Sequence, residues 1–335
     1  MIQQVELTNF GPIAHLKFED LGAINLIIGT NGAGKTFLLK SVYASIKALE
    51  QNGRGKEPRS IKELLVDKLY WTFQADPIGN LVKKGTGELN FSMSSSKNES
   101  FQFSFGKDTS KSIANLQNSF EKRESNSIFI PSKEVLSLQT IIQKSRNRDK
   151  EFGFDDTYYD LANALLPRSQ GRNRKSFSNA RKQLSDAIGG IIEFNKDKNE
   201  WMFHDINRKE FSISLTSEGI KKVSILDALL GNHTLDRDSI IFIDEPEAAL
   251  HPELISKFLD IIAILANDGL QFFIATHSYF VIKKLYLIAN QKKGMPIPVI
   301  SFEAEDPKQY DLSKGMPENP IIRESIRLYE EEIDL

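Results

Sequence analysis

The N-terminal part of the chain carries a strand-type pattern of apolar residues that changes to a helix-type pattern after residue 34. Segments 2–10, 14–18 and 24–29 contain β-branched or alternating apolar residues, and Gly–Pro and Leu–Gly pairs separate them. From residue 37 to 50 the apolar residues recur every three or four positions. We therefore predict three strands followed by an amphipathic helix.

The middle of the chain alternates between short strand patterns and a basic helical region. Strict alternation in ELNFSMS (88–94) and SFQFSFG (100–106) predicts a β-hairpin. SIFIPSKEVL (127–136) predicts a short buried strand that ends at its proline, and a basic helical region follows up to about residue 190. GIIEFNKDKNEWMFHDI (190–206) predicts a second hairpin with a polar turn.

The last third of the chain has the pattern of a parallel α/β sheet. SIIFIDE (239–245) and QFFIATHS (271–278) are apolar runs of strand length, and residues 251–268 between them have the period of an amphipathic helix. Residues 319–335 also have helical spacing, with apolar residues on one face, and we expect this tail helix to dock on the core or on a partner.

Composition narrows the class of protein without identifying it. The 335 residues are 40% hydrophobic and 26% charged, with a net charge of −2, so any basic site must be local. The chain has no cysteine, which excludes disulfides and thiolate zinc sites. No apolar run approaches the roughly 20 residues of a membrane span, and the N-terminus is unlike a signal peptide. We expect a cytoplasmic protein without membrane contact.

A phosphate-binding motif lies between the third predicted strand and the first predicted helix. GTNGAGKT (Gly29–Thr36) fits the pattern G-x-x-x-x-G-K-[ST]. Its glycines let successive backbone N–H groups point at phosphate oxygens. We predict that ATP contacts the loop residues Asn31, Gly32, Ala33 and Gly34 together with Lys35, and that Thr36 binds Mg²⁺.

Two further strand ends carry candidate catalytic residues. Asp244 and Glu245 follow four apolar residues, so we predict that Asp244 holds Mg²⁺ and that Glu245 polarises the attacking water. Capping of the next helix is the alternative role for this pair. His277 follows the next apolar run, at the strand end where α/β sheets bind ligands, and we predict that it senses the γ-phosphate.

Taken in order, GTNGAGKT, TSEGIKK, IIFIDEPEAALHPE and IATHS resemble an ABC-type ATPase head. The likeness is closer to the SMC, RecF and OLD-like branch than to transporter subunits, because VELTNFGPIAHLKF precedes the phosphate loop and TSEGI replaces the transporter signature LSGGQ. The resemblance covers roughly half the chain, at both ends.

The resemblance implies an α/β P-loop NTPase fold of ABC-ATPase type, with a mixed central sheet, an antiparallel β-lobe and an inserted helical subdomain. We expect the ATPase core to comprise residues 1–52 and 205–312. An inserted β-hairpin and helical arm would occupy residues 53–204, and a helical tail residues 313–335.

In this family two heads bind ATP between them, head to tail, and the signature turn of one closes over the γ-phosphate held by the other. Carried onto this sequence, Ser217 and Gly219 contact ATP bound to Lys35 of a second copy. The residues are consistent with this contact, because Gly219 lies at the start of a predicted helix. The free backbone N–H groups at a helix N-terminus bind anions such as phosphate. Capping of that helix by Ser217 is the alternative, and the two roles are compatible.

Two positions depart from the family pattern or are hard to place. His251 stands where the family usually has an aspartate, so the role of that aspartate in communication between the two ATP sites is not carried over to this sequence. The glutamine that the family uses as a metal ligand is hardest to place, and we assign it to Gln139.

The resemblance implies an ATP-hydrolysing homodimer, or an oligomer of such dimers, that regulates a separately encoded effector such as a nuclease or toxin in antiphage defence. OLD nucleases append a Toprim domain, but only 58 residues follow His277, and we expect the acidic segment EAEDPKQYD (303–311) to be a surface loop. Two alternatives stay open: a RecF-like repair ATPase that clamps DNA, and a nucleotide-gated scaffold with negligible turnover.

A basic stretch is the one candidate contact for nucleic acid. Residues 168–182, from Arg168 to Lys182, hold six Arg or Lys and no acid, and residues 144–150 add four more cations. Such a patch can neutralise phosphates, but it lacks interleaved aromatic residues for base stacking. A partner-protein surface is the alternative.

Overall fold

The computed structural model describes residues 1–55, 59–166, 174–291, 294–303 and 307–335. The chain divides into two compact units. The first comprises Met1–Glu124 and Phe273–Leu335, and the second comprises Ser125–Phe272. The two units are defined by contacts between residues. The domain boundaries predicted at residues 52, 204 and 312 rest on sequence motifs instead, and they stay a prediction.

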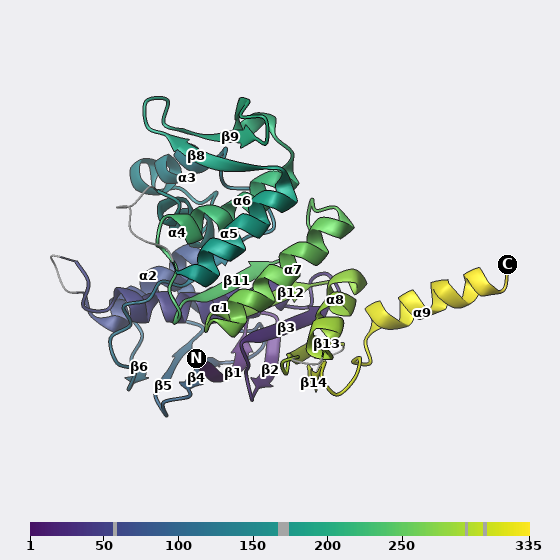
Figure 1. The fold of residues 1–335 in the computed structure, drawn as a ribbon. Helices are drawn as coiled ribbons and strands as arrows, with labels where there is room; N and C mark the ends of the chain where they lie inside the picture. The colour runs from purple at the N-terminus through teal and green to yellow at the C-terminus, as the bar shows by residue number, and fades with distance from the viewer. Residues whose placement is uncertain (56–58, 167–173, 292–293, 304–306) are drawn as a thin grey trace. The chain divides into compact units, whose positions relative to one another are not determined.

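The first unit contains a five-stranded antiparallel sheet, the predicted β-lobe (Figure 1). Its strand order is β2-β1-β4-β5-β6. The strands are β1 (Ile2–Phe10), β2 (Ile13–Phe18), β4 (Glu88–Ser95), β5 (Ser100–Gly106) and β6 (Asn115–Asn118). Residues along β4 and β5 alternate between buried and exposed, and Phe91 and Phe103 stack on the buried face at 5.0 Å. The predicted hairpin is confirmed, with Phe91 opposite Phe103.

A second group of strands in the first unit places the phosphate loop. Their order is β14-β13-β3-β12. Their bounds are β3 (Ile24–Gly29), β12 (Gln271–Thr276), β13 (Pro298–Phe302) and β14 (Lys308–Asp311). Strand β13 pairs parallel with β3 and antiparallel with β14, so the sheet is mixed. The unit boundary falls within β12, which begins at the end of the second unit.

The helices of the first unit follow the apolar periodicity of the sequence. They are α1 (Lys35–Gln51), α2 (Ile61–Phe73), the 3-10 helix η1 (Ile78–Leu81), α8 (Tyr279–Ala289) and α9 (Pro320–Ile333). The predicted first helix and tail helix are confirmed. Helix α2 begins with a capping box in which Ser60 and Glu63 each accept a backbone N–H of the other residue.

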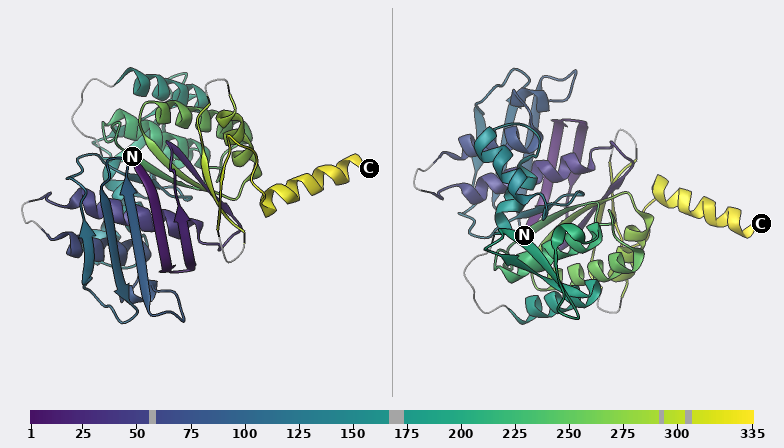
Figure 2. Two further views of the ribbon diagram at one scale, coloured as in Figure 1. Left: turned by 90° about the horizontal axis from the view of Figure 1, so that it is seen from below. Right: turned by 90° about the horizontal axis from the view of Figure 1, so that it is seen from above.

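The second unit combines two parallel strands, a small sheet and a group of helices (Figure 2). Strand β11 (Ile240–Asp244) pairs parallel with β7 (Ile128–Ile130), and β10-β9-β8 form an antiparallel sheet. The strands of this small antiparallel sheet are β8 (Gly190–Asn195), β9 (Glu200–Asp205) and β10 (Glu210–Ser212). The helices are α3 (Gln139–Lys144), the π-helix η2 (Ser145–Asp149), α4 (Asp156–Ala164), α5 (Lys175–Ile188), the 3-10 helix η3 (Ile213–Leu215), α6 (Glu218–Gly231) and α7 (Pro252–Asn267).

One expectation about secondary structure is wrong. Segment 303–311 was expected to be a surface loop, but Lys308–Asp311 form strand β14. These residues pair with β13, with Tyr310 opposite Val299, because β13 is a buried apolar strand with a free side for a partner. Glu305 and Asp306 lie outside the described residues.

Candidate functional site

The phosphate loop has the backbone that its glycines predict. Gly34 caps α1 with a φ of 108°, a conformation that L side chains rarely adopt. A Cβ at Gly34 would lie 3.3 Å from Ile13 and 3.4 Å from Pro12. Asn31 and Gly32 are exposed. The loop therefore presents backbone to solvent at the positive end of a 17-residue helix, an arrangement suited to an anion.

Lys35 is the buried cation of the loop. Its side chain donates hydrogen bonds to the carbonyl oxygens of Gly29, at 2.8 Å, and Thr30, at 2.9 Å. These two bonds hold the ammonium group against the loop that it follows. Thr36, the next residue, is half-buried in the first turn of α1.

His277 directly follows β12, which is one of the two neighbours of β3 in the strand order. The residue is exposed, whereas every residue of β12 is buried. The backbone N–H of Ser278 donates to the hydroxyl of Thr276 at 2.9 Å, which turns the chain into α8. The histidine thus lies at an open strand end, and its contact with a γ-phosphate stays a prediction.

The residues present fit ATP and Mg²⁺ in chemistry. The glycine loop leaves room for phosphate, and the Thr36 hydroxyl and Asp244 carboxylate are hard oxygen donors of the kind that Mg²⁺ prefers. Among the described residues, no three His, Asp or Glu side chains form a cluster that could hold a metal alone.

Asp244 and Glu245 lie at a sharp turn in the second unit. Asp244 ends the buried strand β11, and Glu245 has a φ of 49°, in the left-handed region that costs a non-glycine residue about 1 kcal/mol or more. The Glu245 carbonyl accepts the backbone N–H of Ala248 at 3.0 Å, which closes the turn. A strained glutamate at the end of a buried strand is typical of a functional site.

Helix α6 begins as the sequence predicts. The Ser217 hydroxyl accepts the N–H of Ile220 at 3.3 Å, so the capping role of Ser217 is observed. Ser217 itself is exposed, whereas Gly219 is buried. A Cβ at Gly219 would lie 2.8 Å from the carbonyl oxygen of Ala249 and 3.3 Å from a methyl group of Leu250. Gly219 is therefore needed for contact between α6 and the segment after Glu245.

We expect Gly219→Ala to destabilise the second unit. Alanine favours a helix by about 1 kcal/mol over glycine, but forcing a methyl group against a backbone oxygen costs about 1–3 kcal/mol. The free energy of unfolding in denaturant should therefore fall by roughly 1 kcal/mol. Gly153→Ala is the control, because its Cβ would meet only Ser145 at 3.8 Å. Unchanged or increased stability of Gly219→Ala would contradict this packing.

Lys222 connects α6 to the turn at Glu245, a role that is not among the predictions from the sequence. The residue is 4% exposed, and its ammonium group donates to the backbone carbonyl of Glu245. Burial lowers the pKa of Lys222 to about 8, and the nearby carboxylates of Glu247, Asp244 and Glu245 oppose this effect. A lysine on the buried face of an apolar helix was the available signal, because such a residue needs an acceptor.

Gln139 is held by its own unit. Its amide nitrogen donates to the carbonyl of Ala162 at 2.6 Å, and its amide oxygen accepts the indole N–H of Trp201 at 3.0 Å. Gln139 is 6% exposed. The oxygen that a metal would need is engaged with Trp201, so the geometry favours a structural role, and the assignment as a metal ligand stays an unsupported prediction. His251 caps α7, because its Nδ1 accepts the N–H of Glu253 at 3.3 Å.

Two arginines of the basic segments form salt bridges inside the second unit. Residues 167–173, including Arg168 and Arg172, lie outside the described part of the chain. Arg181 forms a salt bridge with Asp227 at 2.8 Å, and Arg146 forms one with Asp156 at 3.0 Å. These two cations are therefore occupied by structural partners, which reduces the described surface available to phosphates.

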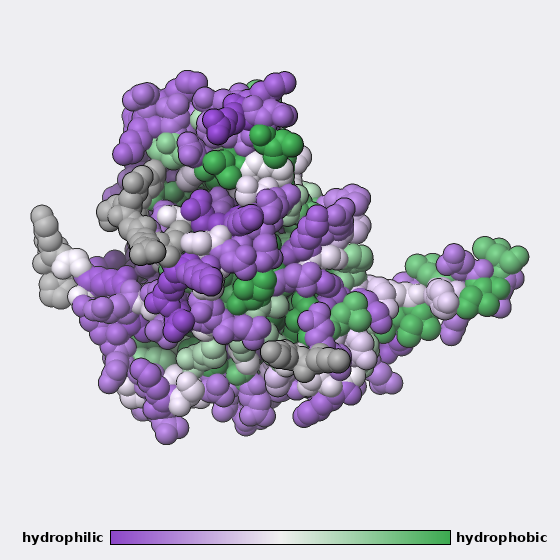
Figure 3. All heavy atoms as spheres, in the orientation of Figure 1, coloured by the Kyte–Doolittle hydropathy of each residue, from purple (hydrophilic) through white to green (hydrophobic). Residues whose placement is uncertain are grey.

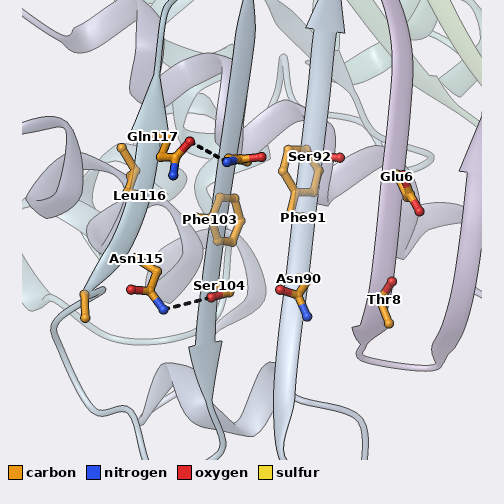
Figure 4. Close-up of a pocket in the computed structure, with 12 residues that line it drawn as sticks. Glu6, Thr8, Asn90, Phe91, Ser92, Phe103, Ser104, Asn115, Leu116 and Gln117 are labelled. Atoms are coloured by element: carbon orange, nitrogen blue, oxygen red, sulfur yellow. Dashed lines mark hydrogen bonds between the residues drawn. The ribbon is translucent and has the colours of Figure 1, made fainter.

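Two of the hollows on the described surface lie on the β-lobe and beside α6. One, of about 550 Å³, lies on the polar face of the β-lobe, where the Gln102 and Gln117 side chains are hydrogen-bonded and Asn115 donates to Ser104 (Figure 4). Its one charged lining residue is Glu6, so it does not suit a phosphate. The other, of about 380 Å³, lies beside α6 and is lined in part by Lys222, Glu218 and Ala249.

Comparison with known families identifies the chain. Residues 24–283 match the family described as "AAA domain, putative AbiEii toxin, Type IV TA system". The chain belongs to this family. The matched residues span the phosphate loop, the turn at Glu245 and His277. Comparison with curated proteins finds no match.

Solved structures give the same fold. An SMC head bound to the C-terminal winged-helix domain of ScpA matches with a TM-score of 0.55 and 15% identity, covering 92% of this chain and 97% of that one. The SMC head of Pyrococcus furiosus, with an extended coiled coil and bound to the C-terminal domain of ScpA, matches with a TM-score of 0.50 and 12% identity, covering 98% of each chain. The family match supports the predicted resemblance to an ABC-type ATPase head, and the likeness to the two SMC heads shows that this chain shares their fold. Helices long and apolar enough to span a membrane are absent from the described residues.

Proposed function

We propose that the protein binds ATP and Mg²⁺ between two copies, hydrolyses the ATP, and passes the resulting change to a separately encoded effector. One observation supports this most: the exposed start of α6 at Ser217 is tied, through Gly219 and Lys222, to the turn that carries Glu245. A loss of phosphate at Ser217 would therefore act directly on the catalytic turn.

Each candidate residue has one task in this proposal. The backbone N–H groups of the loop and the Lys35 ammonium bind the phosphates. Thr36 and Asp244 would hold Mg²⁺, which supplies charge neutralisation on the phosphate oxygens. Glu245 accepts a proton from the attacking water, and His277 donates a hydrogen bond to the γ-phosphate.

Ser217 and Gly219 act on the ATP of the second copy in this proposal. The α6 N-terminus adds a positive dipole where that γ-phosphate is bound. Because the phosphate then bridges two copies, its removal opens the dimer. The protein thus passes on a movement of its two copies rather than a chemical product. The family description names a putative toxin of a type IV toxin–antitoxin system. The regulatory role in antiphage defence extends beyond that description and is part of the proposal.

A mixing experiment tests whether the site is shared. We expect Lys35→Ala and Ser217→Asp each to lose ATP turnover. Aspartate caps a helix as well as serine does, so Ser217→Asp keeps α6 but opposes the phosphate with a charge. In an equal mixture, half of the dimers are mixed and each retains one intact composite site. Turnover should therefore return to about a quarter of the wild-type rate.

The control for this experiment is Ser214→Asp, which changes an exposed serine three residues earlier. It should leave turnover unchanged. A mixture of Lys35→Ala and Ser217→Asp that stays inactive would show that Ser217 does not complete a site on the other copy. To identify the effector, proteins and nucleic acids that co-purify with ATP-bound Glu245→Gln should be compared with those on Lys35→Ala.

A further inference from the structure

The C-terminal helix α9 is firmly attached at one end. Asn319 is fully buried, and its side chain accepts the N–H of Ile321 at 2.9 Å and donates to the hydroxyl of Ser301 at 2.6 Å. Ser301 belongs to the buried strand β13, and Pro320 occupies the first turn, where proline favours a helix start. The direction of α9 is therefore set by the core of its unit.

The rest of α9 extends away from its unit (Figures 1 and 2). Ile322 is 7% exposed, but Ile326 is 49%, Tyr329 63% and Ile333 66% exposed. Apolar side chains are visible along the whole helix between polar ones (Figure 3). Arg327 forms salt bridges with Glu324, at 2.6 Å, and with Glu331, which stabilise the helix on the opposite face.

The apolar residues of α9, the buried Ile322 and three exposed ones, have the spacing of a coiled-coil seam. Ile322, Ile326, Tyr329 and Ile333 are separated by four, three and four positions, which corresponds to heptad positions d, a, d and a. The four side chains therefore share one stripe along the helix. A stripe of this kind packs against another helix rather than against a flat surface.

The charges beside the stripe match a second copy in the antiparallel direction. Arg323 and Glu330 both occupy heptad position e, and antiparallel pairing brings each e position next to e of the other helix. In the register that pairs Ile326 with Tyr329, and so places Ile333 at the level of the buried Ile322, each Arg323 faces Glu330 of the second copy. Neither residue makes a salt bridge within the described part of the chain.

The parallel direction lacks this match. It would place the acidic ends of both helices side by side, each carrying Glu330, Glu331, Glu332 and Asp334. Like charges at this distance destabilise a pair. We propose that α9 pairs antiparallel with α9 of a second copy of this chain, through the Ile322–Ile333 stripe and two Arg323–Glu330 salt bridges. This contact needs no nucleotide and does not depend on the proposed function.

Charge reversal tests the contact in the full-length, nucleotide-free protein. Sedimentation velocity at about 1 to 100 µM covers the affinity range of a small helix pair. Arg323→Glu and Glu330→Arg should each weaken the dimer about tenfold, because two attractive pairs become repulsive. A 1:1 mixture of the two variants should regain the dimer, since every facing pair then has opposite charges. The double variant should also regain it.

Two variants separate this contact from other effects. Ile326→Asp places a charge in the stripe at a largely exposed position and should leave the protein monomeric without nucleotide. Leu328→Asp is the control, because Leu328 is 53% exposed but lies off the stripe, and the dimer should remain. A wild-type protein that stays monomeric throughout this range, or a mixture that fails to regain the dimer, would overturn the proposal and assign the stripe to another occupant.

Discussion

Replacing Lys35 with alanine should weaken ATP binding by about thirtyfold to a few thousandfold. The substitution removes a buried cation whose ammonium group lies in the phosphate loop and donates to the carbonyls of Gly29 and Thr30. Loss of one partner from a buried, hydrogen-bonded charge pair costs about 2–5 kcal/mol, and each 1.4 kcal/mol is a factor of ten. Isothermal titration calorimetry with ATP and Mg²⁺ measures this directly.

Two comparisons show whether the loss is specific. Lys40→Ala changes a half-buried lysine of the same helix, outside the motif, and should bind ATP with wild-type affinity. The circular dichroism spectrum of Lys35→Ala should match that of the wild type, because α1 keeps its buried face of Leu38, Leu39 and Val42. If Lys35→Ala binds ATP as tightly as the wild type, nucleotide is held elsewhere.

The elements that the sequence predicts best are those with a local signal. The strands of the β-lobe hairpin alternate between buried and exposed residues, and this alternation is visible in the sequence. The start of α6 carries a serine cap, and α1 follows a glycine loop, so both starts are local as well. The family and the fold class are predictable for the same reason, because they rest on short motifs.

Strand β14 and helix α2 are not among the elements predicted from apolar periodicity. Strand β14 has no apolar run and forms because β13 offers it a neighbour. Helix α2 was missed although Ser60 and Glu63 have the spacing of a capping box before an apolar segment. The start of α2 is therefore predictable from the sequence, from the spacing of Ser60 and Glu63.

The same distinction applies to the candidate site. The sequence predicts roles for Lys35, Asp244 and Glu245 from their place in motifs. It does not reveal that Gly219 packs on Ala249, because this contact joins segments thirty residues apart. Gln139 was assigned by analogy alone, and its hydrogen bonds to Ala162 and Trp201 arise from packing that no motif encodes.

Glu245→Gln should bind ATP with wild-type affinity but hydrolyse it about a hundredfold to ten-thousandfold more slowly, the range that a general base contributes. Glutamine has the size of glutamate and keeps the side chain polar, but its amide cannot accept the proton of the attacking water. The backbone turn should persist, because the bonds to Ala248 and Lys222 involve the carbonyl of residue 245 rather than its side chain.

The variant should also accumulate as an ATP-bound dimer, because in the proposed function the phosphate bridges two copies and is no longer removed. Light scattering in an Ile326→Asp background, without the α9 contact, makes the change in mass report nucleotide alone. Glu253→Gln, an exposed glutamate paired with Lys257 on α7, is the matched control and should turn over normally. A Glu245→Gln protein that stays monomeric under saturating ATP and Mg²⁺ would count against the shared site. One that hydrolyses ATP at the wild-type rate would remove Glu245 from catalysis. Light scattering tests dimer formation and the hydrolysis rate tests catalysis. The same Glu245→Gln preparation therefore tests the shared site and the catalytic role of Glu245 separately.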